Sequence, residues 1–149
     1  MAAYPSTTTV LDTTQTAVPK SQGANIPFMI EREYDLDALV ATGVANTDVV
    51  NLFTMPANHT ILATYIKTTV IAVGCSSTCT AKLRFSTTDI GAATDILTLA
   101  TGTGGSATVA LPLTVGTAAV LVNLVFAIGG GATTTNPTIK VSLLVCNMA

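Results

Sequence analysis

The chain has 149 residues, of which 49% are hydrophobic and 9% are charged, and its formal net charge at pH 7 is −2. Its length is enough for one domain that folds without a metal or a disulfide, and its negative net charge excludes a nucleic-acid binder that works through a basic patch. Soluble domains usually contain about 25% charged residues, so this low charge predicts a surface largely covered by other protein molecules.

The first segment, residues 1–25, is rich in threonine, contains Pro5 and Pro19, and has few large apolar side chains. It cannot bury enough surface to order itself, so we expect an extended N-terminal arm over 1–25 and a β-sandwich domain over 26–149. The arm would be a disordered tail in an isolated protein or would lie along a neighbour in an assembly. Residues 1–6 lack a basic region followed by an apolar one, so no secretory signal is expected.

Acidic residues alternate with other residues over 27–37, a period of two that predicts a strand with one wet face. Its acidic residues are Glu31, Glu33, Asp35 and Asp37. On a strand these carboxylates spread over roughly 20 Å, which is too dispersed for one calcium ion. We therefore expect a solvated edge or one that faces a basic partner. An alternative for residues 36–42 is that the chain leaves the strand and forms a short helix that ends at Gly43.

The rest of the chain alternates between β-rich segments and turn-forming residues. Val, Ile and Thr are abundant, and their branched side chains favour strands over helices. Strands are predicted at 49–55, 61–73, 80–86, 95–100, 107–113, 118–128 and 138–146. Residues 102–106, Gly-Thr-Gly-Gly-Ser, are expected to form a hairpin turn, because the Lys and helix of a phosphate-binding loop are missing. This spacing predicts an all-β fold, an antiparallel sandwich of jelly-roll type.

Two of these segments show the alternation most clearly. Ala81, Leu83 and Phe85 are expected to face inward, and Lys82 and Arg84 outward. In the last strand the inward residues are Ile139, Val141, Leu143 and Val145, and the outward residues are Lys140 and Ser142.

The segment 118–128 is apolar on both of its faces, so each face is expected to pack against another apolar surface that excludes water. We favour another subunit on one side. The candidate subunit-interface residues are Val120, Leu121, Val122, Leu124, Val125 and Phe126. A membrane-spanning helix would need roughly 20 apolar residues, but glycines, Pro112 and threonines flank this run and no basic anchor adjoins it. We therefore expect a buried strand and no membrane partner.

The sequence offers no set of residues for catalysis or metal binding. His59 is the only histidine, and neither a nucleophile beside it nor a G-x-S-x-G motif is apparent. Cys75, Cys79 and Cys146 with His59 would make a weak zinc set, because C-x3-C has no second paired motif. We expect no enzyme, no metal and no cofactor. Cys75 and Cys79 either bridge or remain free thiols, and we favour thiols in a reducing cytoplasm.

The region from about 36 to 145 resembles small structural proteins of tailed bacteriophages, the proteins that decorate or cement the head. The resemblance centres on residues 48–62, DVVNLFTMPANHTIL, where a strand leads through a Pro-Ala-Asn turn into a long Thr/Val strand. A turn at 75–80 then leads into residues 81–85, AKLRF. Family members often have a Gly-Asp element after that strand, whereas this chain has STTDIG at 86–91. The resemblance implies a β-sandwich or jelly roll, often trimeric, seated where capsid subunits meet, and no catalytic residues.

Together these patterns predict a structural virion protein, a capsid decoration (cement) subunit on the capsid surface, made in the host cytoplasm. Its expected partners are copies of itself, as a homotrimer, and the major capsid protein. A related possibility is the major shell subunit itself, although 149 residues is short for a tailed-phage shell. The alternative from another class is a receptor- or carbohydrate-binding β-module of a tail fibre or surface structure. Such sites usually display Trp or Tyr, and this chain has no Trp and three Tyr.

Overall fold

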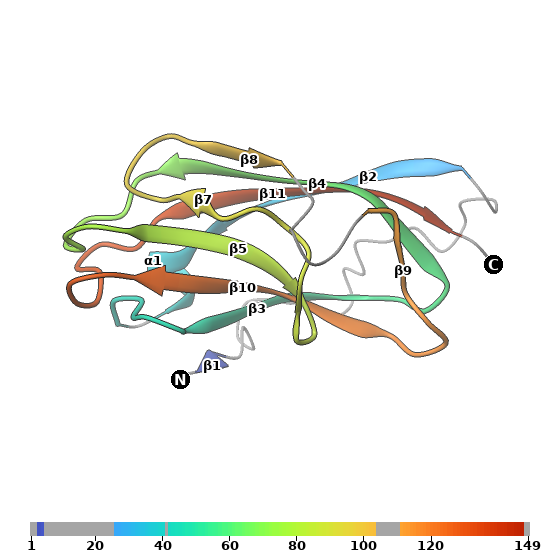
Figure 1. Ribbon diagram of the computed structural model, residues 1–149, viewed down its shortest axis with the longest axis horizontal. Helices are drawn as coiled ribbons and strands as arrows, with labels where there is room; N and C mark the ends of the chain where they lie inside the picture. Colours follow the sequence, from blue (N-terminus) through green and yellow to red (C-terminus); the bar gives the residue numbers. More distant parts are fainter. Residues whose placement is uncertain (1–2, 5–25, 41, 104–110, 148–149) are drawn as a thin grey trace.

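In the computed structural model, which describes residues 3–4, 26–40, 42–103 and 111–147, two β-sheets pack face to face (Figure 1). Sheet 1 contains, in spatial order, β1 (Ala3–Tyr4), β3 (Val49–Met55), β10 (Val120–Ile128), β5 (Cys79–Phe85) and β6 (Thr88–Asp89), with β7 (Thr94–Asp95) also paired to β5. Sheet 2 contains β2 (Pro27–Asp35), β11 (Thr138–Asn147), β4 (His59–Val70) and β8 (Thr101–Thr103), with β9 (Leu113–Thr114) paired to β4. The predicted all-β sandwich is confirmed.

Every described strand pair is antiparallel except that of β1 and β3. Of the predicted arm over 1–25, the structure describes only Ala3–Tyr4, which lie beside Val49 and Val50. The other arm residues lie outside the described part of the chain.

Most predicted strands are present, but the one at 95–100 is wrong. Only Asp95 belongs to a strand there, because its carboxylate turns the chain. Oδ1 of Asp95 accepts a hydrogen bond from the Leu97 N–H at 2.8 Å, and Oδ2 accepts one from the Thr98 hydroxyl at 3.0 Å. Such side-chain bonds to residues two or three positions ahead compete with strand pairing.

The predicted hairpin turn at 102–106 is also wrong in its first part, because Thr101–Thr103 form β8 and pair with β4. Residues 104–106 and most of the predicted strand at 107–113 lie outside the described residues. The short strand β9 begins at Leu113.

A four-residue helix, α1 (Leu36–Leu39), follows β2 directly. Asp35 ends the strand and caps the helix, since its Oδ1 accepts a hydrogen bond from the Asp37 N–H at 3.0 Å. The helix is shorter than the alternative considered for 36–42, and the chain is extended again at Val40.

The core lies between the sheets, where side chains at alternating strand positions meet. The predicted inward residues of β5 and β11 are all buried there, as the period of two requires. The largest fully buried side chains include Leu52, Met55, Leu83, Leu124 and Phe126 from sheet 1, Ile61, Ile139 and Leu143 from sheet 2, and Leu36 from α1. The acidic face of β2 is exposed as predicted at Glu31, Glu33 and Asp35.

Tyr34 packs its ring into this core, but its buried hydroxyl finds no hydrogen-bond partner among the residues that the structure describes. Burial raises the pKa of Tyr34 to about 12, outweighing the lowering effect of Arg32. An unfolded tyrosine ionises near pH 10, so the unfolded state releases its proton first and folding stability falls as the pH rises from about 10 toward 12.

Tyr34→Phe should be at least as stable at pH 7, because it removes an unpaired buried hydroxyl. Urea denaturation of the wild type and of Tyr34→Phe at pH 7 and pH 11 tests both expectations. A less stable variant at pH 7 would contradict the first, and a variant that loses as much stability at pH 11 as the wild type would contradict the second.

Candidate protein-binding surface

The six predicted interface residues of β10 divide between its two faces. Val122, Leu124 and Phe126 are at most 1% exposed and fill the core of this chain's own sandwich. Val120 is half-buried and packs against the same core. An interface on β10 would therefore have to use the opposite face, where Leu121 is half-buried and Val125, which borders a cleft, is only 7% exposed.

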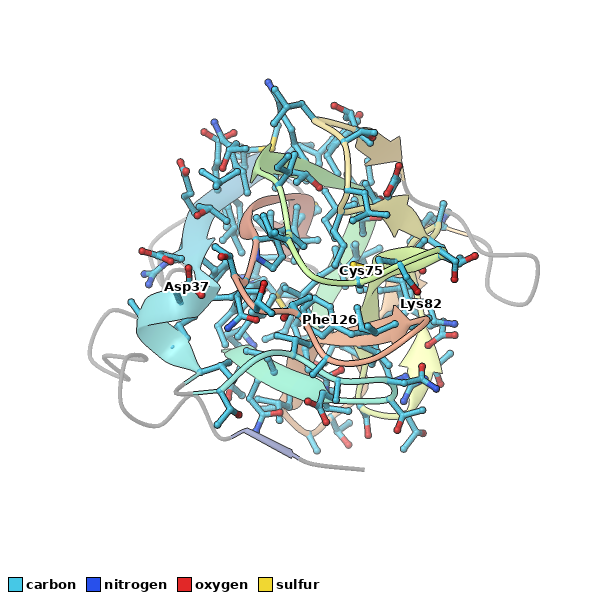
Figure 2. All side chains as sticks on the ribbon, turned by 90° about the vertical axis from the view of Figure 1, so that its left-hand side faces the viewer. Asp37, Cys75, Lys82 and Phe126 are labelled. Carbon is cyan, nitrogen blue, oxygen red and sulfur yellow. A yellow bond between two sulfur atoms is a disulfide. The ribbon has the colours of Figure 1, made fainter. Side chains whose placement is uncertain are left out.

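A different surface has the composition expected of a protein contact. Three loops meet at one end of the sandwich, at the left of Figure 1 and facing the viewer in Figure 2. They comprise residues 71–78, 96–100 and 129–137, and none contains Asp, Glu, Lys or Arg. We call these loops the neutral end. Charged residues are depleted at the centres of protein interfaces, so the composition of these loops favours contact with another protein. The exposed Asp37 of α1 lies at the same end, beside the loop 129–137 (Figure 2).

Large apolar side chains are exposed at and beside the neutral end. Val70 is 50% exposed, Ile71 41%, Val73 51% and Leu99 66%. These four residues, named the apolar patch, lie on two neighbouring segments that are joined by backbone hydrogen bonds. The Ala72 N–H donates to the Ile96 carbonyl at 2.8 Å, and the Thr68 N–H donates to the Ala100 carbonyl at 3.0 Å. Exposed apolar residues that gather in one region mark interaction sites.

The backbone holds Val73 firmly against the loop 129–137. The Val73 N–H donates to the Thr135 carbonyl at 3.0 Å, and the Thr134 N–H donates to the Val73 carbonyl at 2.7 Å. Gly74 then turns with a positive φ of 99°, and a Cβ there would lie 2.6 Å from the Thr134 hydroxyl. A surface ordered before binding loses less conformational entropy when a partner docks.

Asn136 ties the loop 129–137 to the segment that follows α1. Its buried side-chain oxygen accepts a hydrogen bond from the Val44 N–H at 2.9 Å, and its amide donates to the Thr42 carbonyl at 3.1 Å. Thr133 also accepts from the Val44 N–H, at 2.7 Å, and Oδ1 of Asp37 accepts from the Asn136 N–H at 2.8 Å. The sequence carries no local signal for this role of Asn136, because its backbone partners Val44, Thr42 and the partner carboxylate of Asp37 are about 90 to 100 positions away.

A disulfide joins Cys75 to Cys79 at the neutral end, so the expectation of free thiols is wrong (Figure 2). Backbone bonds fix the loop it closes, since the Ser76 N–H donates to the Gly129 carbonyl at 3.2 Å and the Gly129 N–H to the Thr78 carbonyl at 2.9 Å. The third cysteine, Cys146, is free and buried.

His59 occupies a structural position. It is 6% exposed, its Nδ1 lies 2.9 Å from the Ala57 carbonyl oxygen, and its ring meets Phe28 edge to face. Within the ranges that the structure describes, no three His, Cys, Asp or Glu side chains are grouped to hold a metal ion. In the same ranges, no helix has both the length and the apolar character needed to cross a membrane.

Comparison with solved structures identifies a protein chain of similar fold. No protein-family model matches the chain, and no curated protein sequence matches it. Among solved structures, a chain of the capsid of Ralstonia phage GP4 superposes with a TM-score of 0.65, at 15% identity and over 98% of each chain. At that identity the likeness establishes a common architecture. The chain thus shares its fold, along nearly its whole length, with a chain of that phage capsid.

Proposed function

We propose that this protein is a structural component of a virion, a decoration (cement) subunit that binds the major capsid shell and performs no catalysis. The observation that carries this proposal is the fold likeness to a phage-capsid chain over 98% of both chains. The low charge of the sequence supports the same role, because a subunit packed among other proteins needs little charge for solubility.

The neutral end and the apolar patch form the surface that contacts the shell. They combine exposed aliphatic side chains, uncharged loops and a backbone fixed by hydrogen bonds to the loop 129–137. A subunit that binds only the assembled shell stabilises it by mass action, by about 2.7 kcal/mol per site at a free concentration 100 times Kd. On the capsid surface the protein acts as a homotrimer, and its arm, 1–25, extends over adjacent shell subunits.

Co-sedimentation tests the shell contact. The full chain is mixed with shells purified from the phage that encodes it, and bound protein is quantified after centrifugation. Val73→Asp combined with Leu99→Asp should weaken binding about 30-fold or more, because loss of a central interface contact costs at least about 2 kcal/mol. Both side chains are at least half exposed, so the variant should fold normally.

Ile26→Asp is the matched control for this double variant. Ile26 is also an exposed apolar residue, at 53%, but it precedes β2 at the other end of the sandwich. Its replacement should leave binding within about threefold of the wild type, as surface substitutions cost roughly 0.5 kcal/mol or less. Equal binding by all three proteins would overturn the assignment of the neutral end, and absence of any binding by the wild type would overturn the decoration role.

A further inference from the structure

Sheet 1 has a cleft on its outer face, and two basic side chains line it. Its volume is about 330 Å³, room for about ten water molecules at roughly 30 Å³ each. Lys82 and Arg84 of β5 line it together with Val125, the cross-strand neighbour of Lys82 on β10, and Asn46. Both basic groups form ion pairs with Asp89. Two cations share that carboxylate, so this part of the cleft keeps a positive excess.

Asp89 is itself held ionised in this arrangement. Burial raises the pKa of Asp89, but hydrogen bonds from Lys82 and Arg84 outweigh it and bring that pKa below its ordinary value. The three side chains thus form a fixed group rather than separate mobile charges, with Lys82 34% and Arg84 24% exposed. Figure 2 labels Lys82 at the side of the molecule away from Asp37.

The opposite charge lies on sheet 2. Strand β2 is the last strand of that sheet, and no other described strand pairs with its outer edge. Its exposed residues are Glu31, Glu33 and Asp35. Lys140 pairs with Glu31 and lowers the pKa of that carboxyl, assisted by Ser142. Glu33 accepts a hydrogen bond from the Thr69 hydroxyl. Because β2 carries Glu31, Glu33 and Asp35 against Arg32, this strand keeps a negative excess. We call it the acidic edge.

A two-fold contact between two acidic edges is unfavourable. Antiparallel pairing of β2 with its own copy about Glu33 would place Glu33 opposite Glu33 and Glu31 opposite Asp35. Like charges directly opposite one another destabilise a strand pair, and acidic side chains on an edge strand prevent such pairing in natural sheets. Self-association through β2 therefore needs a different surface on the second copy.

We propose that the acidic edge of one copy docks against the cation-lined cleft of the next copy. The two surfaces lie on different sheets, so one molecule can use both at once. Such a head-to-tail contact closes into a ring when the rotation between copies permits it, and three copies would give the trimer. The inference rests on the proposed function for the oligomer, and it assigns the two surfaces that build it.

Charge exchange tests this contact. Sedimentation velocity on the full chain measures self-association of the wild type, Glu33→Lys, Lys82→Glu and the combined variant. Each single variant places like charges at every contact and should raise the dissociation constant about tenfold or more. The combined variant restores opposite charges and should return within about threefold of the wild type. Higher salt should weaken the wild-type oligomer, because exposed charges are screened.

Two controls keep the result interpretable. Thr117→Glu adds a negative charge at an exposed position between β9 and β10, outside both proposed surfaces, and it should leave self-association unchanged. Lys82→Gln, with thermal unfolding of every variant, shows whether a loss of association comes from misfolding at Asp89. A persistently monomeric wild type, unchanged folded single variants or a folded combined variant that fails to recover would overturn the proposal. A monomer that still binds shells would overturn this inference alone, and an oligomer that binds no shell would overturn the decoration role alone.

Discussion

Phe126→Ala is expected to lower the free energy of unfolding by about 3–5 kcal/mol, as for other large aromatic side chains removed from a core. Phe126 is 1% exposed and sits on the central strand of sheet 1 between β3 and β5. Its loss removes buried apolar area and leaves a cavity that both sheets line. Urea denaturation followed by circular dichroism measures this change, since the chain has no Trp for fluorescence.

Leu121→Ala is the matched comparison for this substitution. Leu121 belongs to the same strand but is only half-buried, so its truncation should cost clearly less, about 1 kcal/mol. The two values together separate the core face of β10 from its outer face. A cost for Leu121→Ala equal to that for Phe126→Ala would mean that the inner and outer faces are wrongly assigned.

Asn136→Ala should have the second largest effect on stability, about 2–4 kcal/mol. Its side chain accepts a hydrogen bond from the Val44 N–H and donates to the Thr42 carbonyl in a buried setting. The substitution also removes the bond that the Thr133 hydroxyl donates to Asn136, and each lost bond costs about 0.5–1.5 kcal/mol. The Val44 N–H keeps Thr133 Oγ1 as an acceptor. Chemical denaturation gives the total, and hydrogen exchange at the Val44 amide should become faster.

Thr134→Ala serves as the control for Asn136→Ala. Thr134 lies in the same loop, but its hydroxyl is exposed and donates only to the Val73 carbonyl, at 3.2 Å. We expect a cost of about 0.5 kcal/mol or less, as for most surface substitutions. If Asn136→Ala proved equally mild, the buried amide would not be what fixes the loops of the neutral end.

Strands with one solvent-exposed face were predictable from the sequence, because alternation of polar and apolar residues with a period of two shows which side is buried. This holds for β5 and β11, where Lys82 and Lys140 mark the outer face, and for the acidic row of β2. It failed at 95–100, where the apolar residues suggested a strand but the Asp95 carboxylate turns the backbone. Local side-chain bonds of this kind leave no trace in hydrophobic periodicity.

The candidate surface was less predictable than the fold, because exposure depends on where a strand ends relative to the core. Val70 and Val73 were read as part of one long strand, yet β4 stops at Val70 and the following residues are exposed. The apolar pattern of 118–128 predicts a subunit interface at Leu124 and Phe126, whereas the two-sheet core of this chain buries both side chains completely. The sequence does hold one signal for two of the three loops, because no charged residue lies between Asp95 and Lys140.

Cryo-electron microscopy of capsid shells incubated with the full chain tests the central proposal most directly. We expect density for the sandwich on the outer shell surface, with the loops 71–78, 96–100 and 129–137 against the shell and the free end of β2, near Ile26, turned away from it. Shells without added density at saturating protein, or sandwiches attached by the end that carries Ile26, would contradict the proposed function.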